Sequence, residues 1–253
     1  MAEKLAQIKE KLDAAAGEEL EALLALYEQD ERAGARKLAE QKRKQLARLA
    51  AERQRLEEMR QFEHMYEEYG LVCGIDEAGR GPLAGPVAAG AVILPRDCEI
   101  LYLNDSKKLS AAKRDELYEE IQEKAVAWGC GIVGAGRIDE INILQATYEA
   151  MCEAIGSLKV MPDGLLNDAV TIPQVRIRQI AIVKGDARSV SIAAASIIAK
   201  VTRDRMMAEY AELFPEYGFD VHKGYGTAAH IEALKKYGPC PIHRRSFIKN
   251  FGF

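Results

Sequence analysis

The chain has 253 residues, 48% of them hydrophobic, and a formal net charge of −4. This length fits one large domain, or one ordinary domain with an appendage. No stretch approaches the roughly 18 consecutive apolar residues of a membrane-spanning helix, and the charged N-terminus lacks a signal-peptide core. The 5 cysteines form an odd set without CxxC spacing, which argues against a disulfide framework and a thiolate zinc site. We therefore expect a cytoplasmic, monomeric protein with free thiols and no membrane partner.

The first 70 residues differ from the rest in composition. They contain 13 Lys+Arg and 16 Asp+Glu side chains, whereas all 8 prolines and all 5 cysteines lie after position 70. Residues 71–253 carry 22 basic and 23 acidic side chains, a balance typical of a globular domain. The composition predicts an appendage over residues 1–70 and a main domain over residues 71–253.

Apolar residues of the appendage recur at helical spacing. From residue 2 to about residue 29 they are three or four positions apart, which predicts an amphipathic helix. The pattern breaks at residues 30–35, where Gly34 is a stop signal, and an approximate heptad then predicts a second helix over residues 38–66. The apolar stripes are narrow, so we expect a hairpin of marginal stability that gains from packing on the main domain or on a partner.

Charge is distributed unevenly along the appendage. Residues 1–31 hold 3 basic and 9 acidic side chains, whereas residues 32–60 hold 10 basic and 4 acidic ones. A basic stripe of this kind can follow a phosphate backbone, because each neutralised phosphate releases counterions. It is equally consistent with a solvated helix face of mixed charge. Both interpretations stay open at this point.

The main domain consists of short apolar runs between turn signals. Strands are predicted at residues 71–75, 87–94, 126–133, 165–168 and 177–183, and helices at residues 114–123, 141–155 and 192–213. The strands are first adjacent along the chain and then alternate with helices. This order predicts an α/β fold with a mixed β-sheet flanked by helices.

Four acids lie at the ends of predicted strands. Asp76 and Glu77 follow an apolar strand and precede a glycine-rich segment, Asp168 closes another strand, and Asp186 follows a third. Functional groups of open α/β sheets collect where strands end, and hard oxygen ligands suit Mg²⁺ or Mn²⁺ better than zinc. Two such ions can activate a water molecule and stabilise the leaving oxygen of a phosphoryl displacement. The pattern predicts a site for hydrolysis of a phosphodiester.

Each acid taken alone has a simpler explanation. Strand-end aspartates are usually turn formers or helix caps, and Asp186 could cap the following helix. Alternation along a strand would separate Asp76 from Glu77, unless a local bend brings both into one cavity. The four acids beside a Gly-Arg-Gly segment favour a site, whereas Asp105 and Asp163 lie in polar turns and are expected to be structural.

Several sequence blocks match a known signature in order. They are GIDEAGRGPLAGPV at 74–87, NDSKKLS at 104–110, IDEINIL at 138–144, KGD at 184–186, AASIIAKVTRD at 194–204, HKGY at 222–225 and HRRSF at 243–247. Together they resemble bacterial ribonuclease HII over about residues 71–247, and GRGP after Asp-Glu resembles that type more than ribonuclease HIII. The resemblance implies a ribonuclease H-like fold with a C-terminal helical part, to which the N-terminal helical appendage is added.

The resemblance also implies an activity. Asp76, Glu77, Asp168 and Asp186 match the family's catalytic acids, which bind two Mn²⁺ or Mg²⁺ ions. Family members are endoribonucleases that cleave the RNA strand of RNA–DNA hybrids and nick duplex DNA 5′ to embedded ribonucleotides, leaving 3′-hydroxyl and 5′-phosphate ends. Asn167 departs from the aliphatic residue usual before the third acid.

Substrate-binding roles follow from the same resemblance. Gly79, Arg80 and Gly81 would contact the 2′-hydroxyl, because glycines allow close approach of the backbone, and Tyr225 would stack on the next deoxyribose. Lys107 and Lys108 are expected to contact phosphates. Read without the family, the tyrosine is a loop residue and the lysines are solvated. Some relatives carry an extension that assists substrate binding, and the basic second helix fits that role.

Other charged side chains and two other activities stay open. Lys200, Arg203, Arg244 and Arg245 fit phosphate contacts or helix-surface charges, and the four histidines lack metal-ligand spacing, so we expect them to be structural or exposed. Another two-metal phosphoesterase of the same fold is the first alternative activity. A non-catalytic nucleic-acid-binding module, with the acids as caps, is the second.

Overall fold

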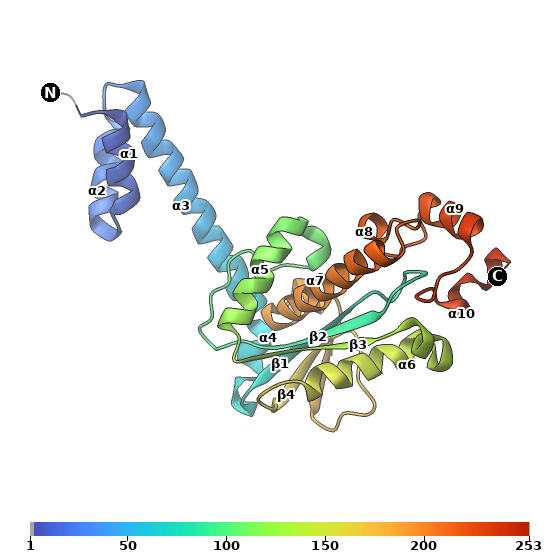
Figure 1. Cartoon of the computed structure of the whole chain (residues 1–253). Coiled ribbons are helices and arrows are strands. Elements are labelled where there is room, and N and C mark those ends of the chain that lie inside the picture. The colour runs from blue at the N-terminus through green and yellow to red at the C-terminus, as the bar shows by residue number, and fades with distance from the viewer. Residues whose placement is uncertain (1–2, 253) are drawn as a thin grey trace. The chain divides into compact units, whose positions relative to one another are not determined.

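The computed structural model describes residues 3–252, which fall into two compact units (Figure 1). The first unit is Met1–Glu57 and the second is Glu58–Phe253. Helix α3, Ala33–Met59, begins in the first unit and ends two residues into the second. No helix among the described residues is long and apolar enough to cross a membrane.

The first unit contains one more helix than the sequence pattern predicted. The single helix expected over residues 2–29 is wrong, because the structure has α1, Leu5–Ala14, and α2, Gly17–Glu28, in its place. Two extended alanines separate them, and Gly17 has a φ of 56°, a left-handed conformation that favours glycine. Ala2, the expected start of that helix, lies outside the described residues. With α3 the two short helices enclose a small core of Ile8, Leu12, Leu20, Leu24, Tyr27, Ala35 and Ala39.

Ion pairs join the basic helix α3 to acidic side chains of α1 and α2. Lys42 Nζ lies 2.9 Å from an Asp13 oxygen, and Arg43 binds both Glu21 at 2.5 Å and Glu28 at 2.8 Å. Solvent screens exposed pairs of this kind, so the apolar core stabilises the unit more than they do. The charge asymmetry of the sequence is therefore partly neutralised by the packing of this unit.

The second unit is built on a mixed five-stranded sheet, as predicted. Its strands are β1 Val72–Ala78, β2 Val87–Ile93, β3 Ala127–Val133, β4 Gly164–Asp168 and β5 Arg178–Ile182. Their order in the sheet is β3-β2-β1-β4-β5. The first three strands along the chain pair antiparallel, whereas β4 and β5 are parallel to β1. The C-terminal ends of β1, β4 and β5 consequently meet at one edge.

Helices cover both faces of the sheet and form the C-terminal part. They are α5 Ala111–Lys124, α6 Ala135–Gly156, α7 Val190–Leu213, α8 Phe219–His222, α9 Ala228–Tyr237 and α10 Arg245–Ile248. Helix α6 packs on one face, where its Met151 belongs to the same buried cluster as Ile75 of β1. Helix α7 lies on the other face (Figure 1), so close that a Cβ on Gly74 would be 2.1 Å from the carbonyl carbon of Ser191. The predicted C-terminal helical part is confirmed.

A short helix, α4, Gln61–Met65, belongs structurally to the second unit. The helix expected over residues 38–66 breaks at Arg60, and α4 then packs through Phe62 against a cluster that contains Leu166 and Ile192. Oε1 of Glu63 accepts hydrogen bonds from the Ser189 hydroxyl at 2.6 Å and from the Ser191 amide at 3.0 Å. These contacts fix α4 to the start of α7.

Candidate functional site

Three of the predicted acids meet at the edge where the parallel strands end. Asp76 lies near the end of β1, Asp168 is the last residue of β4, and Asp186 lies in a 3₁₀ turn, Gly185–Ala187, that leads into α7. One carboxylate oxygen from each lies within 4.8 Å of those of the other two. Because β1 and β4 run parallel, their ends coincide and bring together residues 92 positions apart in the chain.

Local hydrogen bonds hold the aspartates in place. Asp168 Oδ1 accepts from the Gly185 amide at 2.7 Å and so ties the end of β4 to the turn that carries Asp186. The expected alternative, that Asp186 caps the following helix, is wrong. The cap of α7 is Ser189, whose hydroxyl accepts from the Ile192 amide at 3.2 Å.

Glu77 lies beside the aspartate group but outside it. Asp76 and Glu77 are both inside β1, which continues to Ala78 instead of ending before the acids as expected. Successive strand side chains leave opposite faces, so the two carboxylates start from different sides of the sheet. Glu77 Oε1 lies 3.3 Å from Arg80 Nη1, while Oε2 is buried without a hydrogen-bond partner. A buried oxygen without a partner is costly and is available to a further ligand.

The electrostatics of the aspartate group favour a bound cation. Burial, followed by repulsion from Glu77 and Asp168, raises the pKa of Asp76 well above its ordinary value. Burial also raises the pKa of Asp186, with added repulsion from Asp105 and Asp168. Mutual repulsion of this kind is relieved when a cation sits between the carboxylates. The all-oxygen donor set and the orphaned Glu77 oxygen fit a divalent metal ion with hard-ligand preference.

Asp105 and Asp163 occupy the structural positions expected of them. Asp105 Oδ1 accepts from the Lys107 amide at 2.9 Å, and Asp163 Oδ2 accepts from the Leu71 amide at 2.7 Å, at the opposite end of β1 from the aspartate group. Asp105 nevertheless lies near enough to Asp186 to influence its charge.

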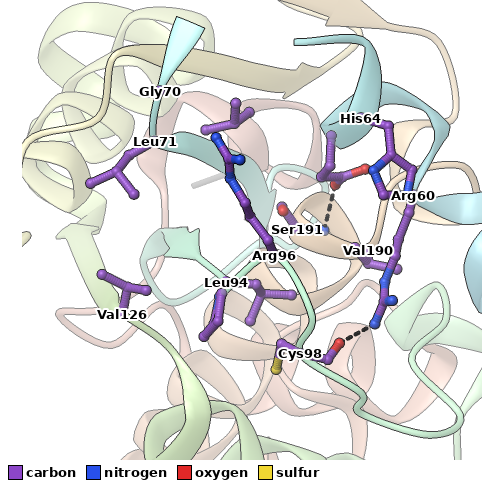
Figure 2. Close-up of a pocket in the computed structure, with 13 residues that line it drawn as sticks. Arg60, His64, Gly70, Leu71, Leu94, Arg96, Cys98, Val126, Val190 and Ser191 are labelled. Carbon is purple, nitrogen blue, oxygen red and sulfur yellow. Dashed lines mark hydrogen bonds between the residues drawn. The ribbon is translucent and has the colours of Figure 1, made fainter. Parts of the chain in front are cut away.

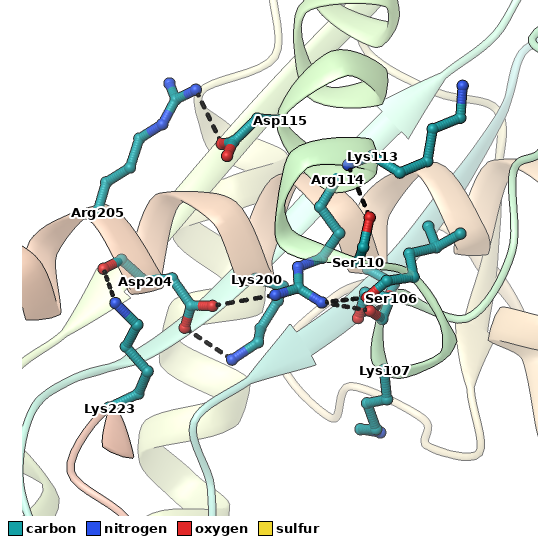
Figure 3. Close-up of polar contacts among 12 residues, drawn as sticks. Ser106, Lys107, Ser110, Lys113, Arg114, Asp115, Lys200, Asp204, Arg205 and Lys223 are labelled. Atoms are coloured by element: carbon teal, nitrogen blue, oxygen red, sulfur yellow. Dashed lines mark hydrogen bonds and ion pairs between the residues drawn. The ribbon is translucent and has the colours of Figure 1, made fainter. Parts of the chain in front are cut away.

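Lys107 is an exposed cation close enough to the aspartates to feel their charge. Burial alone would lower its pKa, but the negative charges of Asp76, Asp105 and other acids raise it. Its turn is fixed to α7 by the Ser196 hydroxyl, which donates to Ser106 Oγ at 2.7 Å. Arg114 of α5 donates to the Ser106 carbonyl at 3.0 Å (Figure 3). Lys108, next in the chain, is also exposed.

Several basic side chains proposed as phosphate contacts have other partners. Lys200 Nζ lies 2.7 Å from Asp204 Oδ1 (Figure 3). Arg203 and Arg244 are fully buried, so both interpretations left open for them, phosphate contact and helix-surface charge, are wrong. Nothing in the residue types alone distinguishes these two from the exposed arginines.

The glycine-rich segment after β1 lies against Tyr225. A Cβ on Gly81 would be 3.7 Å from Tyr225 Cε1, and the tyrosine side chain is 44% exposed. The tyrosine carbonyl receives a hydrogen bond from His230 Nδ1 at 2.9 Å. Arg80 and Gly81 are exposed beside it, whereas Gly79 is buried. Arg80, Gly81 and Tyr225 are therefore accessible on one surface, whereas Gly79 is not.

Three histidines form a buried or partly buried group behind Tyr225. His230 Nε2 lies 3.0 Å from His243 Nε2, and the rings of His222 and His230 stack with their centres 4.4 Å apart. Burial lowers the pKa of His230, and burial together with the neighbouring His230 lowers that of His243 to about 4. The lowered pKa values keep the His230 and His243 rings neutral, and the contacts among the three rings are structural, as expected.

A separate cavity of about 90 Å³ lies at the other end of β1 (Figure 2). It is lined by the start of that strand, by α4 and by the first residues of α7, including Val72, His64 and Ser191. None of the predicted catalytic or substrate-binding residues contributes to its wall. The aspartate group, and not this cavity, is the candidate site.

Comparisons with known proteins agree with the geometry of this site. The sequence profile of Ribonuclease HII matches residues 73–250, and that of the Ribonuclease HII N-terminal domain matches residues 4–67. The chain is 62% identical to ribonuclease HII of Lachnoclostridium phytofermentans over 88% of each chain, and 53% identical to that of Clostridioides difficile over 96% of each. The crystal structure of ribonuclease H2 from Pyrococcus horikoshii OT3 matches 72% of this chain and 99% of its own, with a TM-score of 0.58 and 29% identity. The chain belongs to the ribonuclease HII family.

Proposed function

We propose that this protein is a metal-dependent endoribonuclease that cleaves the RNA strand of RNA–DNA hybrids and nicks duplex DNA 5′ to embedded ribonucleotides. The products carry 3′-hydroxyl and 5′-phosphate ends. The observation that carries the proposal is the meeting of Asp76, Asp168 and Asp186 at the strand ends, within 4.8 Å of one another. Membership of the ribonuclease HII family supports the same activity.

The four acids would hold two divalent ions, Mn²⁺ or Mg²⁺. Asp76, Asp168 and Asp186 provide the shared ligand set, and Glu77 adds its unpartnered buried oxygen. When bound, the ions supply charge stabilisation at the phosphodiester and activation of the attacking water. The chain contributes the fixed positions of the carboxylates, because Asp168 and the turn of Asp186 are joined by the Gly185 amide. No protein side chain is required as a general base.

Recognition of the ribonucleotide would take place beside the acids. The 2′-hydroxyl alone distinguishes a ribonucleotide from its deoxy neighbours, so discrimination requires groups that contact it. We assign this role to the backbone of Gly79, Arg80 and Gly81 and to the side chain of Arg80. We assign stacking on the next deoxyribose to Tyr225. The closeness of Gly81 to the Tyr225 ring supports a common surface. Lys107 and its neighbour Lys108 would contact flanking phosphates from the exposed turn.

A single cleavage assay tests the proposal. The substrate is a duplex with one ribonucleotide, assayed with and without Mg²⁺ or Mn²⁺, beside an all-DNA duplex of the same sequence. We expect a metal-dependent nick 5′ to the ribonucleotide and none in the all-DNA duplex. Equal cutting of both would instead indicate a DNA endonuclease or junction resolvase of the same fold.

A pair of aspartate variants separates catalysis from binding. Asp76→Asn should lower cleavage by orders of magnitude while binding persists, because the substitution removes one metal ligand. Asp115→Asn, on the exposed face of α5, is the matched control and should leave the rate unchanged. An unchanged rate in Asp76→Asn would mean that the acids are structural and the protein is a binding module.

We assign the N-terminal appendage, residues 1–70, to substrate binding. The basic residues of α3 support this role, although Lys42 and Arg43 pair with acids of α1 and α2, and Lys44 and Arg55 pair with acids of α3 itself. The net positive charge of α3 would lie along a nucleic-acid backbone and make binding dependent on salt. The slope of binding affinity against salt concentration, measured with and without the appendage, tests the assignment.

A further inference from the structure

Two arginines are buried beneath the glycine-rich loop without a carboxylate partner. Arg203 on α7 and Arg244 just before α10 are each 0% exposed. Neither forms an ion pair with any residue in the described part of the chain. Burial of a charge without a counter-charge is costly. The two guanidinium groups also lie close enough that the charge of Arg203, after burial, helps to lower the pKa of Arg244 to about 9. A fold that retains this arrangement needs the hydrogen bonds that the two side chains make.

Those hydrogen bonds all go to main-chain carbonyls of one segment, residues 79–86. Arg203 donates from Nε to the Pro86 carbonyl at 2.8 Å and from Nη2 to that of Ala84 at 3.2 Å. Arg244 donates to the carbonyls of Gly85 at 2.9 Å, Arg80 at 2.9 Å and Gly79 at 2.5 Å. We call this pair the arginine clamp and residues 79–86 the clamped loop.

The clamp determines which way the peptide groups of the loop face. A peptide unit is planar, so a carbonyl held toward the protein interior directs the amide of the same unit the other way. With the Gly79 and Arg80 carbonyls bound to Arg244, the amides of Arg80 and Gly81 point away from it, and within residues 3–252 neither finds a main-chain acceptor. Both residues are exposed, and Gly81 lies against the Tyr225 ring.

The far side of the clamped loop is joined to the tyrosine segment. The Leu83 amide donates to the Gly224 carbonyl at 2.8 Å, and the Gly85 amide donates to the Ile242 carbonyl at 2.9 Å. The loop is therefore fixed by the two arginine side chains and by main-chain bonds to the C-terminal part. The amides of Arg80 and Gly81 remain without a main-chain acceptor, beside Tyr225.

We infer that Arg203 and Arg244 are positioning residues that hold the Arg80 and Gly81 amides ready to bind the ribose 2′-hydroxyl, and that ribonucleotide specificity depends on them. The inference rests on the proposed function and extends it to residues that touch no substrate. A loop already held in its bound conformation avoids the entropy cost of becoming ordered on binding. The resulting gain in affinity applies only to a substrate that contacts the held groups. Arginine suits the task because its rigid fork reaches several carbonyls at once, which a lysine cannot do.

The test compares affinities for two duplexes that differ in one hydroxyl. Binding is measured in the Asp76→Asn background, which does not cleave, with a one-ribonucleotide duplex and an all-DNA duplex of the same sequence. We expect Arg203→Lys and Arg244→Lys each to lower the ratio of the two affinities by about tenfold, the value of one hydrogen bond. Arg205→Lys, two residues along α7 and exposed, is the control and should keep the ratio. A purely structural role would weaken both affinities equally.

Each outcome has one meaning. Folded lysine variants that keep the wild-type ratio would overturn the inference. Equal cleavage of the two duplexes by the wild-type enzyme would overturn the proposed function before the clamp is considered. Should neither lysine variant fold, amide hydrogen exchange in the unmodified, substrate-free protein decides. We expect slow exchange at Leu83 and Gly85, and rapid exchange there would show that the loop is not held.

Discussion

Replacing Gly79 by alanine tests the packing of the clamped loop directly. Gly79 has a φ of 94°, which L side chains rarely adopt, and an added Cβ would lie 2.1 Å from Arg203 Nε and 2.7 Å from the Pro86 carbonyl oxygen. The side chain of Arg203 is fully buried and has no space into which to retreat. The substitution therefore forces the loop away from the clamp.

The expected cost follows from two contributions. A positive φ at a non-glycine residue costs about 1–2 kcal/mol. Displacing Arg203 weakens its hydrogen bonds to the Pro86 and Ala84 carbonyls, and a hydrogen bond to a charged group contributes about 1.5–3 kcal/mol. We expect Gly79→Ala to lower the free energy of unfolding by about 3 kcal/mol, allowing for partial relaxation of the loop. For a domain of this size that corresponds to a fall in Tm of roughly 6–12 °C.

Gly81→Ala is the matched control, two residues further along. Its φ is not in the left-handed range, and the added Cβ would meet only Tyr225 Cε1 at 3.7 Å, an ordinary contact. We expect its Tm to stay within about 2 °C of the wild type, while cleavage of the one-ribonucleotide duplex falls because the methyl group lies on the proposed substrate surface. Thermal unfolding of the three proteins checks this. Equal Tm values for Gly79→Ala and Gly81→Ala would refute the reasoning.

Three further predictions concern the domain boundary, the metal and pH. Deleting residues 1–57 should leave a folded catalytic unit with weaker, less salt-dependent binding, whereas deleting residues 1–69 should also lower its Tm, because α4 is removed from the start of α7. Adding Mg²⁺ should raise the Tm of the wild type, by the equivalent of about 2.7 kcal/mol at a hundredfold excess over Kd, and much less that of Asp186→Asn. The pKa of His243 is about 4 in the folded protein against an ordinary 6.5, so as the pH falls this imidazole takes up a proton in the unfolded chain before it does so in the folded protein. Stability should therefore fall as pH falls from about 6.5 to about 4, with a shallower slope in His243→Gln.

The measurements that check them are simple. Fluorescence anisotropy at several salt concentrations measures substrate binding by the two deletion variants, and thermal unfolding measures their Tm. Equal Tm values for both would show that α4 does not stabilise the catalytic unit. Calorimetry with and without Mg²⁺ serves for the metal, and the same stabilisation in Asp186→Asn would remove that residue from the ligand set. Urea unfolding at a series of pH values tests the prediction for His243. If the free energy of unfolding of His243→Gln varied with pH as steeply as that of the wild type, the low pKa assigned to His243 would be contradicted.

The sequence by itself determined the chemistry and the class of fold. Strand-end acids at Asp76, Asp168 and Asp186 are visible because strand and turn signals are local, and hard oxygen ligands indicate a divalent metal wherever they converge. The mixed sheet followed from the order of apolar runs for the same reason. Local signals also misplaced boundaries: Gly17 was too weak a break in the periodic pattern to reveal that the first helix is two helices.

Tertiary structure alone decided what the charged side chains touch. Arg203 and Arg205 are two positions apart on α7, yet Arg203 is buried and holds a loop from inside, whereas Arg205 lies on the surface. Arg244, far away in the sequence, holds the same loop as Arg203. Glu77 likewise stands apart from the aspartate group because the strand continues past it. Burial and hydrogen-bond partners depend on segments more than 100 residues away in the chain, and one sequence read locally contains no signal of that packing.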